Sequence, residues 1–233
     1  MVLIKCKPHC LRMFWKGCIG IVASVLIVVL VAGCGGEKED TYTQNVDGTI
    51  NGHDYVDLGL SVKWATCNVG ASSFKDYGDY FAWGETSTKS TYTEDNSKTY
   101  GESSYNYDIG GDASLDAARA NWGGTWRLPT EKEAQELRGK CSWEWITKDG
   151  KDGEEGYKGF KVTGPNKNSI FLPVAGYRNG PSLYDAGQLG YIWTSAPYEE
   201  DAEKAFRLHF AETSRYVAWG RRYYGRTIRP VSE

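Results

Sequence analysis

The sequence predicts an α+β fold with many short antiparallel strands and two short helices. Of its 233 residues, 40% are hydrophobic and 14% are aromatic, a composition that suits a packed core and excludes collagen-like and fully disordered chains. Short apolar runs alternate with turns rich in Gly, Asn and Asp, which is typical of strands. Two further segments combine helical spacing with start or stop signals, so an all-β fold would not account for them.

Residues 1–33 are predicted to be a lipoprotein signal peptide. The first 16 residues are basic, residues 17–36 carry no charge, and small residues close the apolar stretch, as in secretory signals. The sequence Leu-Val-Ala-Gly-Cys that ends at Cys34 resembles the lipobox of bacterial lipoproteins, and this resemblance implies that Cys34 carries lipid. The alternative is a single transmembrane anchor, because about 20 uncharged residues can span a bilayer.

Residues 34–50 are polar and are predicted to be a flexible tether between the lipid and the domain. The acidic run at residues 37–40 resembles the surface-export signal of Bacteroidetes lipoproteins, although a solvated linker has the same composition. The expected localisation is the cell envelope, as an outer-membrane lipoprotein that faces the medium or, alternatively, the periplasm. The membrane is then a partner of the protein through the lipid on Cys34.

The charge balance argues against a nucleic-acid partner. The first 33 residues contain four of the 27 basic residues and none of the 30 acidic ones, which leaves residues 34–233 with a net charge of about −7. Nucleic-acid-binding domains normally carry an excess of basic residues on one face. No nucleic-acid partner is therefore expected.

Cys67 and Cys141 are the two cysteines that remain after the leader and Cys34 are set aside. Disulfides persist outside the cytosol, so these two are expected to pair in an exported chain. The closed loop of about 75 residues would contribute ~4.5 kcal/mol in the chain-entropy model. A catalytic or metal role for this pair is the alternative, and a metal site is disfavoured because neither cysteine belongs to a CxxC motif or a close Cys/His cluster.

Residues 51–233 are predicted to fold as one domain, because no Pro- or Ser-rich linker divides them. Alternation of apolar and polar residues predicts the strands. They are expected at residues 56–64 with a break at Gly59, then 80–83, 160–163, 169–172, 191–195, 205–210, 216–219 and 227–231. The turn-rich residues 164–168 predict a hairpin. Residues 84–112 are poor in aliphatic side chains and predict a long surface loop.

Residues 112–122 and a segment beginning at Thr130 are the two predicted helices. In the first, Leu115 and Trp122 lie on one face, and a Gly-Gly pair follows as a stop signal. In the second, Thr130 and Glu133 have the spacing of a capping box, in which each residue satisfies a free backbone amide of the other.

Several segments resemble a known family, the major paralogous domain first named from Fibrobacter succinogenes and abundant in Bacteroidetes lipoproteins. The matching pieces are WGGTWRLPT at residues 122–130 and residues 55–65, 78–85, 162–166, 171–178 and 226–231, which run in order through nearly all of 53–231. The family is similar to C-type-lectin-like domains and, more distantly, to formylglycine-generating enzymes. The resemblance implies a C-type-lectin-like fold for residues 51–233. It implies no particular activity, because the family has no agreed biochemical function.

The same resemblance raises calcium-dependent sugar binding and catalysis. Sugar-binding C-type lectins use Glu-Pro-Asn and Trp-Asn-Asp triplets, and neither occurs here, since residues 164–166 read Gly-Pro-Asn. Formylglycine-generating enzymes use a C-terminal pair of cysteines, and no cysteine follows Cys141. The acidic run at residues 149–154 lacks the ligand spacing of a calcium loop. No cofactor and no metal are therefore expected, and calcium is unsupported.

No catalytic residue is assigned, and the protein is expected not to be an enzyme. Neither His53 nor His209 lies in a recognisable catalytic motif. A hydrolase that uses a pair of acidic residues stays open as an alternative, as does a divergent relative of the formylglycine-generating enzymes.

A ligand-binding face is predicted in the late, turn-rich segments, because Tyr, Trp and Arg are enriched at binding surfaces. The candidates are Arg178, Tyr184, Trp219, Arg221 and Tyr223. An ordinary surface containing Arg and Tyr is the alternative. The expected function is a non-catalytic binding module for a glycan or protein ligand. A structural envelope subunit or an adhesin- or pilus-like assembly subunit is the alternative outside enzymes.

Overall fold

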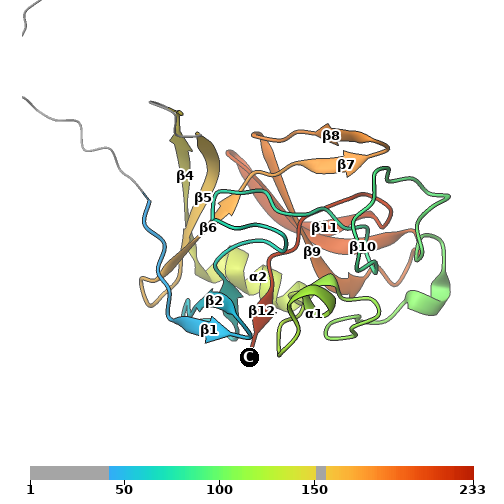
Figure 1. Cartoon of the computed structure of the whole chain (residues 1–233), viewed down its shortest axis with the longest axis horizontal. Coiled ribbons are helices and arrows are strands. Elements are labelled where there is room, and N and C mark those ends of the chain that lie inside the picture. Colours follow the sequence, from blue (N-terminus) through green and yellow to red (C-terminus); the bar gives the residue numbers. More distant parts are fainter. Residues whose placement is uncertain (1–41, 151–155) are drawn as a thin grey trace, which may run out of the picture. The chain divides into compact units, whose positions relative to one another are not determined.

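Four small antiparallel sheets and two helices make up the fold (Figure 1). The structure is a computed structural model that describes residues 42–150 and 156–233, and the counts of elements refer to these residues. They belong to one compact unit, Thr41–Glu233. The predicted α+β class, with many short strands and two short helices, is confirmed.

The first sheet joins strands from both ends of the described chain. Its order is β1 (Gly48–Ile50), β2 (His53–Val56), β3 (Lys63–Ala65) and β12 (Val231–Ser232). The second sheet contains β4 (Ser142–Lys148), β5 (Tyr157–Thr163) and β6 (Ser169–Pro173). The third has the order β11 (Ser214–Arg221), β10 (Lys204–Ala211) and β9 (Leu189–Pro197), and the fourth is the hairpin of β7 (Tyr177–Asn179) and β8 (Ser182–Tyr184).

Helix α1 (Ala117–Trp122) begins later than predicted. Its N-cap is Asp116, whose carboxylate accepts two backbone N–H groups of the first turn at 2.9 and 3.1 Å. The helix ends at Gly123, which has a φ of 65° that favours glycine. The expected helix over residues 112–122 is thus shortened at its start, because its N-cap, Asp116, lies four residues after the expected first residue.

Helix α2 (Glu131–Lys140) confirms the predicted capping box. The Thr130 hydroxyl accepts from the Glu133 amide at 3.2 Å, and the Glu133 carboxylate accepts from the Thr130 amide at 2.7 Å. Ala134 and Leu137 are buried on the inner face. Contacts with β9, β10 and β11 hold the helix against the third sheet.

The predicted hairpin is confirmed as β5 and β6, with Thr163 opposite Ser169. The Gly164 amide donates to the Asn168 carbonyl at 2.9 Å and closes the turn. A Cβ at Gly164 would lie 2.0 Å from the Leu58 carbonyl oxygen, so only glycine fits this contact.

Two large hydrophobic clusters form the core. The first packs α2 against strands of the first three sheets, and the second packs α1 against the aromatic residues between the sheets. The tryptophans of the family-like segments are at most 7% exposed: Trp64, Trp83, Trp122, Trp126 and Trp193. These side chains therefore belong to the packed interior of the domain.

Residues 42–50 belong to the domain and not to a tether. The Tyr42 hydroxyl donates to a β6 carbonyl at 3.0 Å, and the Gln44 amide donates to the Thr66 carbonyl at 2.7 Å. Strand β1 then pairs with β2 over three residues. The expected tether over residues 34–50 is therefore too long at its C-terminal end.

Most predicted strands are confirmed with shifted bounds. The segment expected at residues 56–64 is split into the end of β2 and the start of β3, while β9, β10 and β11 extend their predicted segments at both ends. The strand expected at residues 80–83 is reduced to one isolated bridge, between Phe81 and Arg226. In the strand expected at residues 227–231, Thr227 forms an isolated bridge and Val231 begins β12. Strands β1, β4, β7 and β8 were not predicted.

The loop at residues 84–112 is irregular, as predicted, but part of it is packed inside. Its regular structure is a bridge at Tyr92 and a 3₁₀ turn, Ser103–Tyr105. Tyr92, Thr99 and Ile109 are at most 1% exposed. The loop is therefore part of the domain and shapes its surface.

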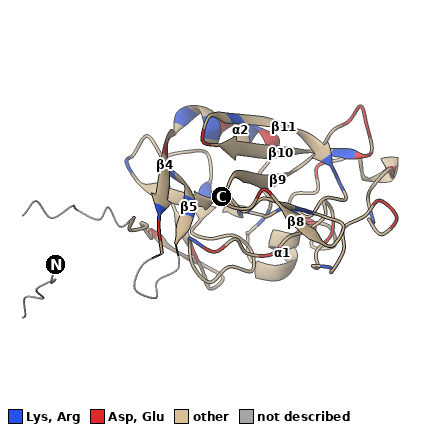
Figure 2. Cartoon of the chain, turned by 90° about the horizontal axis from the view of Figure 1, so that it is seen from above, with Lys and Arg blue, Asp and Glu red and all other residues tan. Residues whose placement is uncertain are grey.

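Basic and acidic residues are interspersed over the described ribbon (Figure 2). The predicted signal peptide at residues 1–33 and the lipidation site Cys34 lie outside the described residues. Within residues 42–150 and 156–233, no helix has the length and apolar character needed to cross a membrane.

Candidate functional site

Two of the five predicted ligand residues meet through Tyr100, which lies in the long loop. The Arg221 guanidinium donates to the Tyr100 hydroxyl at 2.7 Å and to the Glu94 carboxylate at 3.0 Å. The Tyr100 ring packs edge-on against the Tyr223 ring, with the centroids 5.1 Å apart. The loop and the end of β11 are thereby joined.

The contacts continue from Tyr223 to a third predicted residue, Tyr184. Tyr223 contacts Tyr224 at 4.6 Å between ring centroids, and Tyr224 contacts Tyr177 at 5.1 Å. Tyr177 stacks on Tyr184, its partner across the β7–β8 hairpin, at 5.6 Å. We call Tyr100, Tyr223, Tyr224, Tyr177 and Tyr184 the tyrosine row. Tyr100, Tyr177 and Tyr224 were not among the predicted ligand residues. Tyr224 adjoins Tyr223 in the sequence, whereas Tyr100 and Tyr177 contact residues that are distant in the chain, Tyr223 and Tyr224.

Tyr184, at one end of the tyrosine row, is its only exposed member. Tyr184 is 45% exposed, and the Arg221 side chain, which contacts Tyr100 at the other end of the row, is 44% exposed. Tyr223 is only 8% exposed, and burial together with Tyr224 raises its pKa to about 12. Tyr223 therefore packs inside the domain, and the row is not a continuous binding surface.

The remaining two predicted residues, Arg178 and Trp219, lie elsewhere. Arg178 alternates with Tyr177 on β7, and its guanidinium lies 5.2 Å from the Tyr80 ring centroid on the other side of the hairpin. Trp219 is 45% exposed on β11, with the Lys204 ammonium 4.0 Å above its ring. The five residues thus do not form one ligand face.

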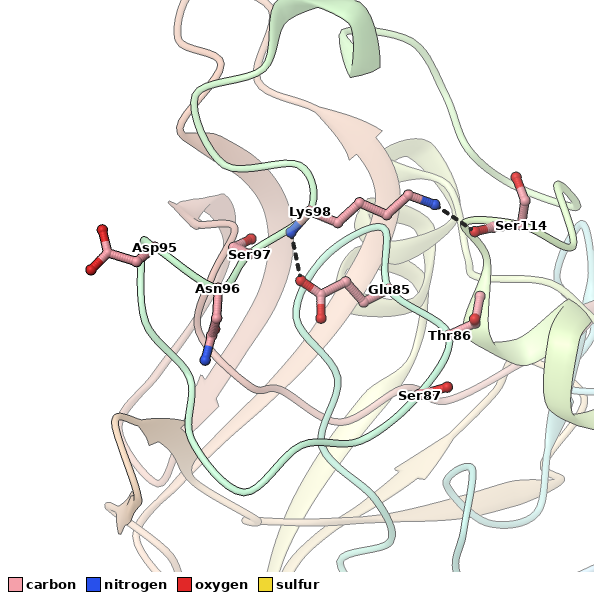
Figure 3. A pocket seen from close by; sticks show the side chains of 8 residues that line it. All are labelled: Glu85, Thr86, Ser87, Asp95, Asn96, Ser97, Lys98 and Ser114. Atoms are coloured by element: carbon pink, nitrogen blue, oxygen red, sulfur yellow. Dashed lines mark hydrogen bonds between the residues drawn. The ribbon is translucent and has the colours of Figure 1, made fainter.

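A polar pocket of about 450 Å³ lies within the long loop (Figure 3). Every residue that lines it is polar or charged: Glu85, Thr86, Ser87, Asp95, Asn96, Ser97, Lys98 and Ser114. Sequence reasoning did not select these residues. The only signal was the polar composition of residues 84–112, which also describes any solvated loop.

Hydrogen bonds across the pocket hold its shape. The Glu85 carboxylate accepts from the Lys98 amide at 2.9 Å, and the Lys98 ammonium donates to the Ser114 carbonyl at 3.2 Å, as the dashed lines in Figure 3 show. The Lys89 ammonium pairs with Glu85 at 2.7 Å and also donates to the Asn96 carbonyl at 2.9 Å. These contacts tie both arms of the loop together.

The pocket keeps groups that a ligand can use. In the described part of the chain, the side chains of Thr86, Ser87 and Asp95 have no hydrogen-bond partner in the protein, and the Ser97 hydroxyl is buried without one. Hydroxyls both donate and accept, and a carboxylate accepts, so together they suit a ligand with several hydroxyl groups.

Arg222 holds the loop at residues 84–112 through hydrogen bonds from inside the domain. Its fully buried guanidinium donates to the Lys204 carbonyl at 3.0 Å, the Thr99 carbonyl at 3.1 Å, the Glu102 carbonyl at 3.4 Å and the Asn106 side-chain oxygen at 2.6 Å. It also lies 4.5 Å from the Trp83 ring centroid. Burial lowers the pKa of Arg222 to about 10, so the group remains charged at neutral pH.

The expected disulfide is not present: Cys67 and Cys141 are both free thiols. The Cys67 thiol donates to the Ala71 carbonyl at 3.5 Å and packs against the second core cluster. Cys141 packs against the first core cluster. The prediction was wrong because it rested on compartment alone, whereas a bridge also requires the two residues to meet in the fold.

No group of three or more His, Cys, Asp and Glu side chains that could hold a metal ion occurs within the described ranges. His53 stacks on the Trp122 ring at 3.8 Å, and His209 lies 4.5 Å from the Tyr216 ring centroid, so each histidine packs against an aromatic ring. Most of the acidic run at residues 149–154 lies outside the described residues.

Comparison with known proteins adds no identification. The chain matches no protein-family model, no curated protein and no solved structure.

Proposed function

We propose that the protein is a non-catalytic binding module of the cell envelope whose polar pocket binds a glycan. In this proposal the domain is C-type-lectin-like, belongs to the family first named from Fibrobacter succinogenes, and is held at the outer membrane by lipid on Cys34. The resemblance of residues 30–34 to a lipobox supports the localisation, and the resemblance of the family segments supports the fold. The pocket supports the ligand class.

The observation that carries the proposal is the polar lining of a pocket whose arms are already fixed. Sugars present arrays of hydroxyl groups, each of which donates and accepts hydrogen bonds. Thr86, Ser87 and Asp95 offer both kinds of group without an internal competitor. Because Arg222 and the Glu85 contacts hold the loop, little ordering would be needed on binding, which favours affinity.

The chemistry of the pocket also supports binding over catalysis. Acid–base hydrolysis of a glycoside needs two carboxyl groups that act on one bond. Glu85 is engaged by the Lys89 ammonium and the Lys98 amide, so Asp95 is the one carboxylate in the pocket that such contacts leave free. Calcium is not part of the proposal.

A glycan array with the purified protein tests the proposal, with and without a chelator. We expect binding to a subset of glycans that the chelator leaves unchanged. Asp95→Ala should weaken that binding at least about tenfold, because a hydrogen bond to a charged group contributes about 1.5–3 kcal/mol.

Glu144→Ala is the matched control, since Glu144 is an exposed carboxylate on β4 and lines no part of the pocket. It should bind like the unchanged protein. Absence of binding across a broad array, or equal affinity of Asp95→Ala and the unchanged protein, would refute glycan binding at this pocket.

A second candidate, an assembly subunit, is favoured by the exposed edge of β8. This strand pairs with β7 alone in the described structure, and its Leu183 and Tyr184 are 39% and 45% exposed. An exposed apolar edge strand can add a strand from another chain. Sedimentation over a range of concentrations tests this candidate. If it holds, the protein self-associates and Leu183→Lys abolishes the association, whereas a monomer at all concentrations rules it out.

A further inference from the structure

Three basic side chains gather on one face of the third sheet, away from the polar pocket. Arg207 and His209 are two residues apart on β10 and therefore point to the same face. Arg226 comes from the segment after β11 and lies over Gly220, where a Cβ would be 2.2 Å from its guanidinium. Glycine at position 220 makes room for this arginine.

Aromatic rings surround the three groups. The guanidinium carbons of Arg207 and Arg226 lie 5.0 and 5.1 Å from the same ring centroid, that of Tyr191. The His209 ring lies between Tyr191 and Tyr216, at 5.0 and 4.5 Å. Tyr216 is 43% exposed, so this side of the cluster reaches solvent.

The basic groups keep buried nitrogen atoms without protein partners. In Arg207 and Arg226, Nε and Nη1 are buried and have no hydrogen-bond partner, and Nδ1 of His209 is in the same state. Arg226 is 3% exposed and His209 is 5% exposed. Neither arginine forms an ion pair with any residue that the structure describes.

Two other buried arginines, Arg222 and Arg229, have their guanidinium groups hydrogen-bonded to oxygen atoms of the protein. Arg222 donates to four oxygen atoms, and Arg229 donates to three, at 2.9, 3.0 and 3.0 Å. Both hold backbone segments together. The Tyr216 side chain is a hydrogen-bond partner of Arg207, but no backbone oxygen in the described structure accepts from either Arg207 or Arg226. A role as backbone clamps therefore does not account for them.

The arrangement is electrostatically costly unless a negative group joins it. Burial lowers the pKa of Arg226, and the neighbouring Arg207 lowers it further. Burial likewise lowers the pKa of Arg207. An unpaired buried charge destabilises a fold, whereas a hydrogen-bonded anion between two guanidinium groups removes both the repulsion and the missing hydrogen bonds.

We propose that Arg207, Arg226 and His209 form a binding site for a small oxyanion. The guanidinium fork matches the paired oxygens of a carboxylate or a phosphate, and the surrounding rings exclude water from those contacts. The site is separate from the polar pocket and does not depend on glycan binding there. The oxyanion can belong to an acidic sugar or be free phosphate, because both present paired, negatively charged oxygen atoms to the guanidinium groups.

Thermal unfolding of the purified protein at constant ionic strength tests the site. The probes are galacturonate and inorganic phosphate, with galactose and chloride as the neutral and simple-salt references. At tenfold excess over its Kd, a specific oxyanion should raise Tm by roughly 3–6 °C. A response to galacturonate alone indicates an acidic sugar, and a response to phosphate alone indicates the free ion.

Arg207→Met separates this role from a structural one. It should abolish the response to the oxyanion while leaving the Tm of the free protein unchanged or higher, because it removes a repelled charge. Arg215→Met is the matched control. Arg215 lies on the opposite face of the same sheet, 5.5 Å from the Trp143 ring centroid, and its variant should keep the response. His209→Gln provides a second variant of the site.

The proposal is overturned if no oxyanion raises Tm above the chloride reference. It is equally overturned if Arg207→Met and His209→Gln respond like the unchanged protein, since phosphate stabilises many proteins without a site. A large drop in the Tm of the free Arg207→Met protein, with the oxyanion response retained in His209→Gln, would also assign Arg207 to structure alone.

Discussion

Replacing Arg222 tests how the polar loop is held in place. Arg222→Met keeps an unbranched side chain of similar length but removes all four hydrogen bonds to residues 99, 102, 106 and 204. At least one stranded acceptor is buried, because Thr99 is fully buried. The partners left behind are neutral oxygen atoms, and each buried acceptor without a donor costs about 1–3 kcal/mol, so the loss of several such bonds should destabilise the protein by about 3–5 kcal/mol. That loss corresponds to a fall in Tm of roughly 6–20 °C for a domain of this size.

Urea unfolding and hydrogen exchange together check this prediction. The free energy of unfolding should fall by the amount above, and the amides of residues 99–106 should lose protection while those of β5 and β6 keep it. The free energy of unfolding of Arg222→Lys should lie between those of the unchanged protein and Arg222→Met. A single ammonium group cannot donate to all four acceptors, which are placed around the planar guanidinium group. Arg221→Met, a change at the exposed neighbouring arginine, should cost less than about 1 kcal/mol. A loss below about 1 kcal/mol for Arg222→Met, or unchanged protection at residues 99–106, would refute the reasoning.

Three further outcomes are expected. Burial and two nearby guanidinium groups lower the pKa of His209 to about 4, so the unfolded chain takes up the proton first on acidification. Stability should therefore fall by about 3 kcal/mol as pH drops from 6.5 to 4, and urea titrations of His209→Gln should lack this part of the loss. The buried Asp116 carboxylate accepts four backbone N–H groups, and Asp116→Asn should reduce the free energy of unfolding by about 2–4 kcal/mol, because the amide offers one acceptor oxygen and turns donors toward donors. Because Cys67 and Cys141 are free, a reductant should leave Tm unchanged, and alkylation of Cys141 should be slow since burial raises its pKa to about 11.

Features set by neighbouring residues could be predicted from the sequence. The capping box at Thr130 depends on two residues three positions apart, and the structure reproduces it. The hairpin at residues 164–168 follows from its turn residues in the same way. Strand β4 also carried a local signal, the alternation of Trp143 and Trp145 with polar residues, which was missed because the segment follows a helix directly.

Features that depend on distant residues could not be predicted. Tyr42 and Gln44 look like parts of a polar linker until their partners on β6 and near β3 are in place. Tyr223 looks like a surface tyrosine, yet Tyr100 from the long loop covers it. Arg226 reads as an ordinary charge near the C-terminus, and only the sheet pairing brings it beside Arg207.

The place of β12 in the first sheet bears on how the chain acquires its fold. The strand pairs with β3, whose residues lie more than 160 positions earlier in the sequence. The first sheet therefore cannot be completed until residues 231 and 232 are available to pair. Such a long-range closing step slows folding. Removal of residues 231–233 would accordingly disturb the strands formed by residues 48–65.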